Sequence, residues 1–170
     1  MMKALVLATS LLFLGCTYSQ ARHGKSSSPP DRPVSVQTYE GLARLIAWMQ
    51  PCVQEARRTF PDARKKFLDG LPNGYEFSVV ARLRDAEGHI EQVFIRVNDV
   101  TGPLIHGVVT NETSTVQGFK TGAVVLVSED EILDWIIVSP DGHETGNLIG
   151  KNLDRVQDSP RPGDACRPTS

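Results

Sequence analysis

The apolar residues change their spacing once along this chain, near Gly74, and this change constrains the fold more than any other feature. Between residues 38 and 71 they recur every three or four positions, as on one face of a helix. From residue 77 to residue 138 they alternate with polar residues or form short runs, which is typical of strands. Helices followed by strands predict an α+β fold, in which N-terminal helices pack on a strongly bent antiparallel sheet of about five strands.

Two prolines interrupt the helical segment. Proline fits the first turn of a helix but not its interior, so we expect breaks at Pro51 and Pro61 that divide the segment into separate helices. Thr38 is a candidate N-cap, and either Gly70 or the turn LPNG at 71–74 ends the last helix.

Five segments carry the strand pattern, and turn residues separate them. The loop at 86–88 makes the first two strands a hairpin, and SPDG at 139–142 has the chemistry of a turn. The expected strands lie at residues 77–83, 93–97, 105–110, 123–127 and 132–138.

Both faces of this sheet carry apolar residues. Alternation groups Val79, Ile95 and Leu126 on one face, and the other face still carries apolar side chains. These are Val80, Phe94, Val108, Val125 and Trp135. Either the sheet curls and buries this second face against itself, or the second face forms a binding groove.

The first residues have the form of an export signal. A basic start, MMK, precedes eleven uncharged residues at 4–14, whereas a bilayer-spanning helix needs about 20 apolar residues. The sequence LFLGC at 12–16 resembles the lipobox of bacterial lipoproteins. This resemblance implies removal of the signal peptide 1–15 and a lipid on Cys16, with simple secretion as the alternative. Because Thr17 follows instead of the Asp that retains lipoproteins in the inner membrane, the resemblance implies the periplasmic side of the outer membrane.

The segments that flank the folded domain are rich in Ser, Pro and charge and have no apolar period. Such composition cannot offset the entropy of ordering, so we expect a disordered tether at 16–37, a domain at 38–155 and a flexible tail at 156–170. The net charge of −2 becomes −3 when Lys3 is removed with the signal peptide. This weak acidity does not favour nucleic acid as a partner, and it leaves the lipid anchor as the membrane contact.

Two cysteines remain once Cys16 carries lipid. In an oxidising envelope, Cys52 and Cys166 are expected to form a disulfide, and the alternative is two free thiols. The bond would close a loop of about 113 residues and stabilise the fold by on the order of 4–5 kcal/mol.

A family resemblance rests on the later strands. GAVVLV at 122–127 followed by Ile132-Leu133-Asp134-Trp135 resembles the YegJ-like bacterial domain of unknown function (domain of unknown function 2314). Further matching positions are Glu91, Gly107, Asn111 and Gly146. The chain departs from the family pattern with Phe94 for Trp, Gln92 for His and Glu112 for Pro. The resemblance covers roughly residues 55–155 and implies an α+β domain with no assigned activity.

The sequence carries none of the catalytic or phosphate-binding motifs that have a spacing of their own, and no metal or cofactor is expected. Two groups of residues give weaker signals. Asp141, His143 and Glu144 are candidate metal ligands if they are not simply a solvated turn. Glu91, His106 and Glu112 are candidate acids and bases if they are not ordinary surface residues.

The segment 129–135 is the expected recognition site. It combines four acids with an aromatic residue, namely Glu129, Asp130, Glu131, Asp134 and Trp135. Asp134 is either a contact charge or a hydrogen-bonded residue that pins the strand, and Trp135 is either an anchor for a partner or part of the core. The pattern favours a non-catalytic protein-binding module of inhibitor or immunity type, with a basic exported protein as partner. The alternative is a small envelope hydrolase that acts on cell-wall or lipid material through scattered His and Glu residues.

Overall fold

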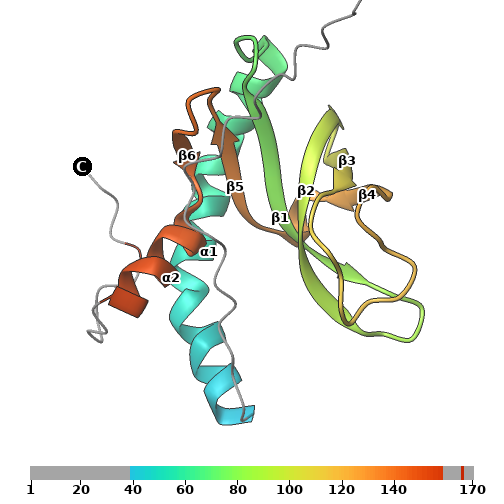
Figure 1. Ribbon diagram of the computed structural model, residues 1–170, viewed down its shortest axis with the longest axis vertical. Coiled ribbons are helices and arrows are strands. Elements are labelled where there is room, and N and C mark those ends of the chain that lie inside the picture. Colours follow the sequence, from blue (N-terminus) through green and yellow to red (C-terminus); the bar gives the residue numbers. More distant parts are fainter. Residues whose placement is uncertain (1–38, 159–165, 167–170) are drawn as a thin grey trace, which may run out of the picture.

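The computed structural model describes residues 39–158 and Cys166 (Figure 1). The expected signal peptide 1–15, the lipid site Cys16 and the tether 16–37 lie outside the described residues, as does most of the tail. Within the described part, none of the helices has the length and apolar character needed to cross a membrane.

One long helix, α1 (Tyr39–Asp69), contains both prolines, so the expected breaks at Pro51 and Pro61 are wrong. Both prolines lie on the exposed side of α1, where water can reach the carbonyls of Ala47 and Arg57 that lose their intrahelical hydrogen bonds. The opposite side is held by packing. Its buried residues are Cys52, Val53, Ala56, Phe60 and Ala63.

The sheet has six antiparallel strands in the order β4-β3-β2-β1-β5-β6 and is not closed into a barrel. The α+β fold is therefore confirmed, with six strands instead of about five. Turn η1 (Glu129–Glu131) joins β4 to β5. The strands are β1 (Glu76–Arg84), β2 (Ile90–Thr101), β3 (Leu104–Val109), β4 (Val124–Ser128), β5 (Ile132–Val138) and β6 (Glu144–Gly146). The sixth strand, β6, is short and has no alternating apolar pattern by which to predict it.

A β-bulge at Leu133 changes the face to which later residues of β5 point. Ala81 pairs with Ile132 and Val80 pairs with Asp134, so Leu133 is the extra residue. Ile132 and Trp135 therefore join the core inside the curled sheet, while Leu133 packs in a second core against α1 and α2. Both faces of β5 are buried, but the second face is not buried against the sheet itself as one expectation had it: Val80 and Leu133 pack on α1 and α2. Val125 and Trp135, which were expected on that face, lie instead in the core inside the sheet.

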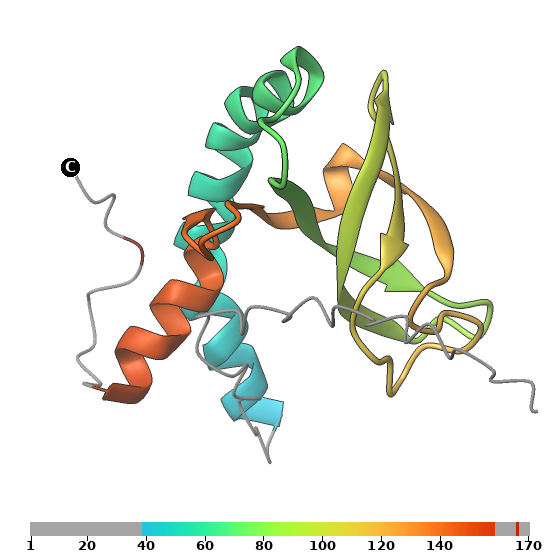
Figure 2. The ribbon, with the colours of Figure 1, turned by 45° about the horizontal axis from the view of Figure 1, so that its top comes forward.

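The second helix, α2 (Leu148–Asp158), was not expected, and it continues past residue 155. It begins directly after β6, where Gly146 has a positive φ of 81°. A Cβ atom on Gly146 would overlap the backbone oxygen and the ring of Trp135, so the chain needs glycine at this close approach. In both ribbon views, α1 and α2 lie together on one side of the molecule, opposite β3 and β4 (Figures 1 and 2).

Candidate functional site

The acidic residues of η1 lie in one turn, as the sequence predicted, but a basic residue of α1 balances part of their negative charge. Glu129 forms an ion pair of 3.0 Å with Arg64 of α1. The guanidinium of Arg57 donates hydrogen bonds of 2.8 Å to the backbone carbonyls of Asp130 and Ile132. The side chains that remain exposed are Asp130 and Glu131.

Trp135 is not on the surface, and the expectation that it anchors a partner is wrong for this reason. Its side chain is only 6% exposed. The indole Nε1 donates to the backbone carbonyl of Ala56 at 3.1 Å and to the hydroxyl of Thr59 at 3.0 Å. Trp135 therefore belongs to the core and fixes β5 against α1.

Asp134 is fully buried, and its carboxylate binds backbone N–H groups. Oδ1 accepts a hydrogen bond of 2.8 Å from the N–H of Trp135, and Oδ2 accepts one of 2.7 Å from the N–H of Ile149 at the start of α2. Burial raises the pKa of Asp134 to about 6, although these hydrogen bonds and nearby Lys151 oppose the shift. Asp134 thus caps α2 and fixes β5 to it through hydrogen bonds; it does not form a contact charge on the surface.

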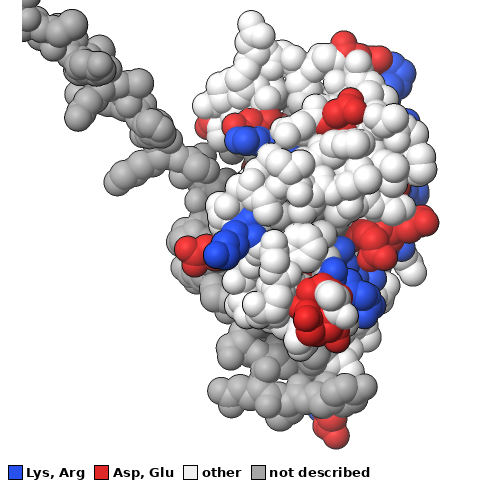
Figure 3. Space-filling model, turned by 90° about the vertical axis from the view of Figure 1, so that its right-hand side faces the viewer, with Lys and Arg blue, Asp and Glu red and all other residues white. Residues whose placement is uncertain are grey.

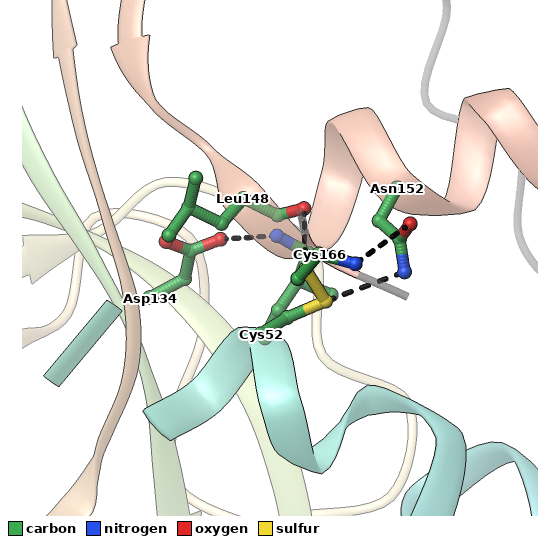
Figure 4. The surroundings of a disulfide bond; sticks show 6 residues. Cys52, Asp134, Leu148, Asn152 and Cys166 are labelled. Atoms are coloured by element: carbon green, nitrogen blue, oxygen red, sulfur yellow. Dashed lines mark hydrogen bonds between the residues drawn. A yellow bond between two sulfur atoms is a disulfide. The ribbon is translucent and has the colours of Figure 1, made fainter. Parts of the chain in front are cut away.

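The expected disulfide between Cys52 and Cys166 is present and lies next to α2 (Figure 4). Cys52 is fully buried in α1, and the two Cα atoms are 5.1 Å apart. Asn152 bridges the pair, since its Nδ2 donates to Cys52 Sγ at 3.3 Å and its Oδ1 accepts from the Cys166 N–H at 3.4 Å. The bond joins the first helix to the C-terminal segment across a sequence separation of 114 residues.

Glu91 holds the loop between β3 and β4 instead of forming an acid–base group with His106 and Glu112. Its carboxylate accepts hydrogen bonds from the N–H groups of three consecutive residues at 114–116, and these bonds lower its pKa although burial opposes them. Among the described residues, no hydrogen bond or ion pair joins Glu91, His106 and Glu112. His106 lies on the exposed side of β3.

Asp85 supports the same loop from the β1–β2 turn. Its buried carboxylate accepts from the N–H of Gln117 at 3.0 Å, from the N–H of His89 at 2.8 Å, and pairs with His89 Nδ1 at 2.9 Å. Burial alone would raise the pKa of Asp85, but these contacts lower it to about 2. With Glu87, the three side chains place ligand atoms within 4.8 Å of one another, a grouping that the sequence reasoning missed. Because the Asp85 oxygens already serve the turn and loop, we assign them to structure.

The candidate metal ligands Asp141, His143 and Glu144 lie in and around the β5–β6 turn and make hydrogen bonds within it. Asp141 accepts a hydrogen bond from the Ser139 hydroxyl and one of 3.3 Å from the N–H of His143. Glu144 accepts from the Asn147 side chain at 2.7 Å. A hollow of about 410 Å³ lies beside this turn, between α1 and α2. Its charged and polar groups include Glu55, His143, Lys151 and Arg155.

The described sheet has two edge strands, the three-residue β6 and the longer β4, and β4 pairs with β3 alone among the described strands. The N–H of Val109 donates to Ala123, and the N–H of Glu129 donates to Pro103, at the two ends of this pairing. In an antiparallel pair of strands, every second residue of β4 makes its backbone hydrogen bonds to β3. The residues between them therefore point their N–H and C=O groups away from β3, toward the open edge. The residues that offer N–H and C=O groups to the open side are Val124, Leu126 and Ser128.

The side chains along this edge are apolar and exposed. Val124 is 80% exposed and Leu126 is 54% exposed, while Val125 and Val127 are buried in the core. This phase is the reverse of the expectation that grouped Leu126 with Val79. The run VVLV is apolar at every position, so its pattern does not say which residues face inward.

A groove of about 500 Å³ lies beside the β4 edge. Its other wall is formed by Arg82 and Arg84 at the end of β1 and by Ile90 at the start of β2, and Glu131 closes one part of it. The surface on this side is largely uncharged, with acidic and basic groups around it (Figure 3). An unpaired strand with apolar side chains and a groove beside it is suited to bind an extended polypeptide.

The model of a protein family described as "Uncharacterized protein conserved in bacteria (DUF2314)" matches residues 47–155. The match spans the described fold from the middle of α1 into α2. None of the curated proteins and none of the solved structures gives a match to this chain.

Proposed function

The chain belongs to the bacterial family DUF2314, and on this premise we propose that it is an exported, non-catalytic module that binds a partner protein along the open edge of β4. The observation that carries the proposal is the edge itself. Val124 and Leu126 expose apolar side chains, and their backbone groups point outward, where no other strand of the described sheet pairs with them. An extended segment of a partner that adds to β4 would satisfy these groups and cover the side chains.

The positions that carry the family resemblance support a role in the fold. Glu91 and Asn111 hold the loop after β3, because Asn111 accepts from the N–H of Phe94 at 2.7 Å. Asp134 caps α2, and Gly146 makes room for Trp135. Since these polar residues are occupied with the backbone, they favour a binding domain over an enzyme built from them.

The disulfide supports export. Disulfides form and persist in oxidising compartments, so the bond between Cys52 and Cys166 favours a location outside the cytoplasm. Together with the basic and apolar N-terminal residues, this favours a protein held by lipid on Cys16 at the periplasmic side of the outer membrane.

The anchor is tested by labelling cells with a fatty-acid analogue. The wild-type protein is expected to take up the label, and Cys16→Ser is expected to lose it and to leave the membrane fraction or remain unprocessed. Equal labelling of both proteins would refute the anchor, while leaving the binding edge open to its own test.

The binding edge is tested by photo-crosslinking in cells. A photoreactive residue in place of Leu126 is expected to give a discrete adduct, whereas one in place of Thr145, at the hollow beside α2, gives none. Replacement of Val124 by Lys, which opposes strand addition at an edge, is expected to abolish the Leu126 adduct without changing the melting temperature. An adduct at Thr145 alone, or one at Leu126 that survives Val124→Lys, would contradict the proposal.

The exposed acids of η1 lie beside this edge. Asp130 and Glu131 can attract basic residues of a partner outside the groove, and such rim charges govern association rate more than affinity. Neutralising both is therefore expected to slow binding and to reduce its dependence on salt.

A further inference from the structure

The groove beside β4 has basic residues on its far wall, and this wall indicates what chemistry the bound segment carries. We infer that the segment is acidic and brings carboxylates onto Arg82 and Arg84. The inference rests on the proposed function and adds to it the chemical class of the partner segment.

The two arginines are spaced as the side chains of an extended segment are. Arg82 and Arg84 are two positions apart on β1, so they project from the same face of the strand at a separation of roughly 6–7 Å. A segment that lies along β4 repeats its own side chains on one face at the same interval. An acidic residue at every second position therefore matches both arginines at once.

The charge of this wall is only partly balanced within the chain. Arg84 donates a hydrogen bond of 3.2 Å to the carbonyl of Gly88, a neutral group. The side chain of Arg82 makes no hydrogen bond or ion pair with any other residue of the described chain. Glu131 is the single acid that lines the groove, and the pairing of Ala81 with Ile132 places it toward the Arg82 end. Arg84 is thus the stronger candidate contact.

The rest of the lining is apolar and fits the alternate positions of such a segment. Val124 and Leu126 lie along the β4 edge, while Ile90 is 46% exposed on the opposite wall. Phe119 lies at the loop that leads into β4. A segment that alternates apolar with acidic side chains would bury the former on these residues and pair the latter with the arginines.

Arg57 and Arg64 provide a contrast within the same chain. Both lie on α1 close to η1, and both are already bonded, Arg64 to the carboxylate of Glu129 and Arg57 to backbone carbonyls. The guanidinium groups beside η1 are therefore held by two hydrogen bonds (Arg57) or by an ion pair (Arg64), whereas the side chains of Arg82 and Arg84 make a single hydrogen bond between them among the described residues and keep donors for an external carboxylate.

The test uses the purified disulfide-bonded protein and short synthetic peptides that alternate valine with glutamate, glutamine or lysine. Alternate backbone N-methylation leaves each peptide a single pairing edge and prevents its self-association. The glutamate peptide is expected to bind about tenfold more tightly than the glutamine peptide, a difference of about 1.4 kcal/mol, because a hydrogen bond from arginine to a charged carboxylate is stronger than one to a neutral amide. The lysine peptide is expected to bind most weakly, and added salt should reduce the difference between glutamate and glutamine.

Substitutions locate the effect. Arg84→Gln is expected to remove most of the preference for glutamate, and Arg84→Lys to restore much of it. Arg96→Gln, an exposed arginine on β2 outside the groove, serves as the matched control and should change nothing.

The outcomes separate this inference from the proposed function. If the glutamate and glutamine peptides bind equally and Val124→Lys abolishes both, the acidic specificity is wrong while strand addition at β4 holds. If none of the three peptides binds, the inference is wrong, and the crosslinking at Leu126 decides separately whether the edge binds a protein. A dimer of the protein alone that Val124→Lys disperses would assign the edge to a second copy and would also overturn the inference.

Discussion

The carboxylate of Asp134 on β5 closes the N-terminal end of α2, because its Oδ2 accepts a hydrogen bond of 2.7 Å from the N–H of Ile149. The first N–H groups of a helix have no partner within the helix, and here a buried side chain from the sheet supplies one. This link couples the position of α2, and of the disulfide beside it, to the bulged strand.

The pH dependence of stability should report this buried carboxylate. Burial raises the pKa of Asp134 in the folded protein to about 6, above the ordinary value of 3.8. Between these pH values the unfolded chain releases the proton and the folded chain keeps it, so stability falls as pH rises through this window, by on the order of 3 kcal/mol. Asp134→Asn lacks this titration. Urea unfolding of both proteins at pH 4 and pH 7 should show the wild type losing stability relative to the variant, and a difference that is constant with pH would contradict the assignment.

Trp135→Ala should unfold the domain at much lower temperature. The ring is 6% exposed and packs in the core, so its removal is expected to cost roughly 3–5 kcal/mol. Leu126→Ala is the matched control, since this side chain is 54% exposed and its loss should change stability by no more than about 0.5 kcal/mol. Thermal melting checks both, and a Trp135→Ala variant that melts like the wild type would return Trp135 to the surface.

Removal of the disulfide should destabilise the fold chiefly because the unfolded chain gains conformational entropy. Cys52 and Cys166 are 114 positions apart, and the chain-entropy estimate for a loop of this size is about 4–5 kcal/mol. Non-reducing urea unfolding of the double variant Cys52→Ser, Cys166→Ser measures the loss, and added reductant should affect the wild type alone. Titration of two free thiols in protein purified from the cell envelope would refute the bond.

Glu91→Gln should loosen the loop before β4. The carboxylate accepts from the N–H groups of residues 114–116, and its lowered pKa means that these bonds are present above the ordinary carboxyl range and are lost in acid. Hydrogen exchange at these three amides should become faster in the variant, and in the wild type as pH is lowered after correction for intrinsic rates. Glu112→Gln, on the same loop but exposed, should leave the exchange unchanged.

Residue types and local spacing predicted the α+β fold, the hairpin turns and the disulfide. They did not predict the uninterrupted α1, because packing along Cys52, Ala56 and Phe60 outweighs the local cost of two prolines on the exposed side. The roles of Asp134 and Trp135 could not be predicted either, because both depend on a one-residue bulge at Leu133. A strictly alternating pattern of inward and outward residues does not predict such a bulge.

The β4 edge was missed for a related reason. VVLV is apolar throughout, so its inward phase is set by pairing with β3, where Ile105 pairs with Val127. The arginines of the groove carried no signal of their own in the sequence, because their relation to β4 arises only when the sheet curls.

The disulfide also determines how the molecule carries mechanical load. When the chain is pulled from both ends, tension enters through α1, crosses from Cys52 to Cys166 and leaves through the residues that follow. The whole sheet lies within the closed loop and is bypassed, so its strands bear no force as long as the bond is intact. If the domain is tethered at one end and pulled at the other, the β4 edge would thus keep its structure. The same tension would separate the strands of a sheet that no disulfide encloses.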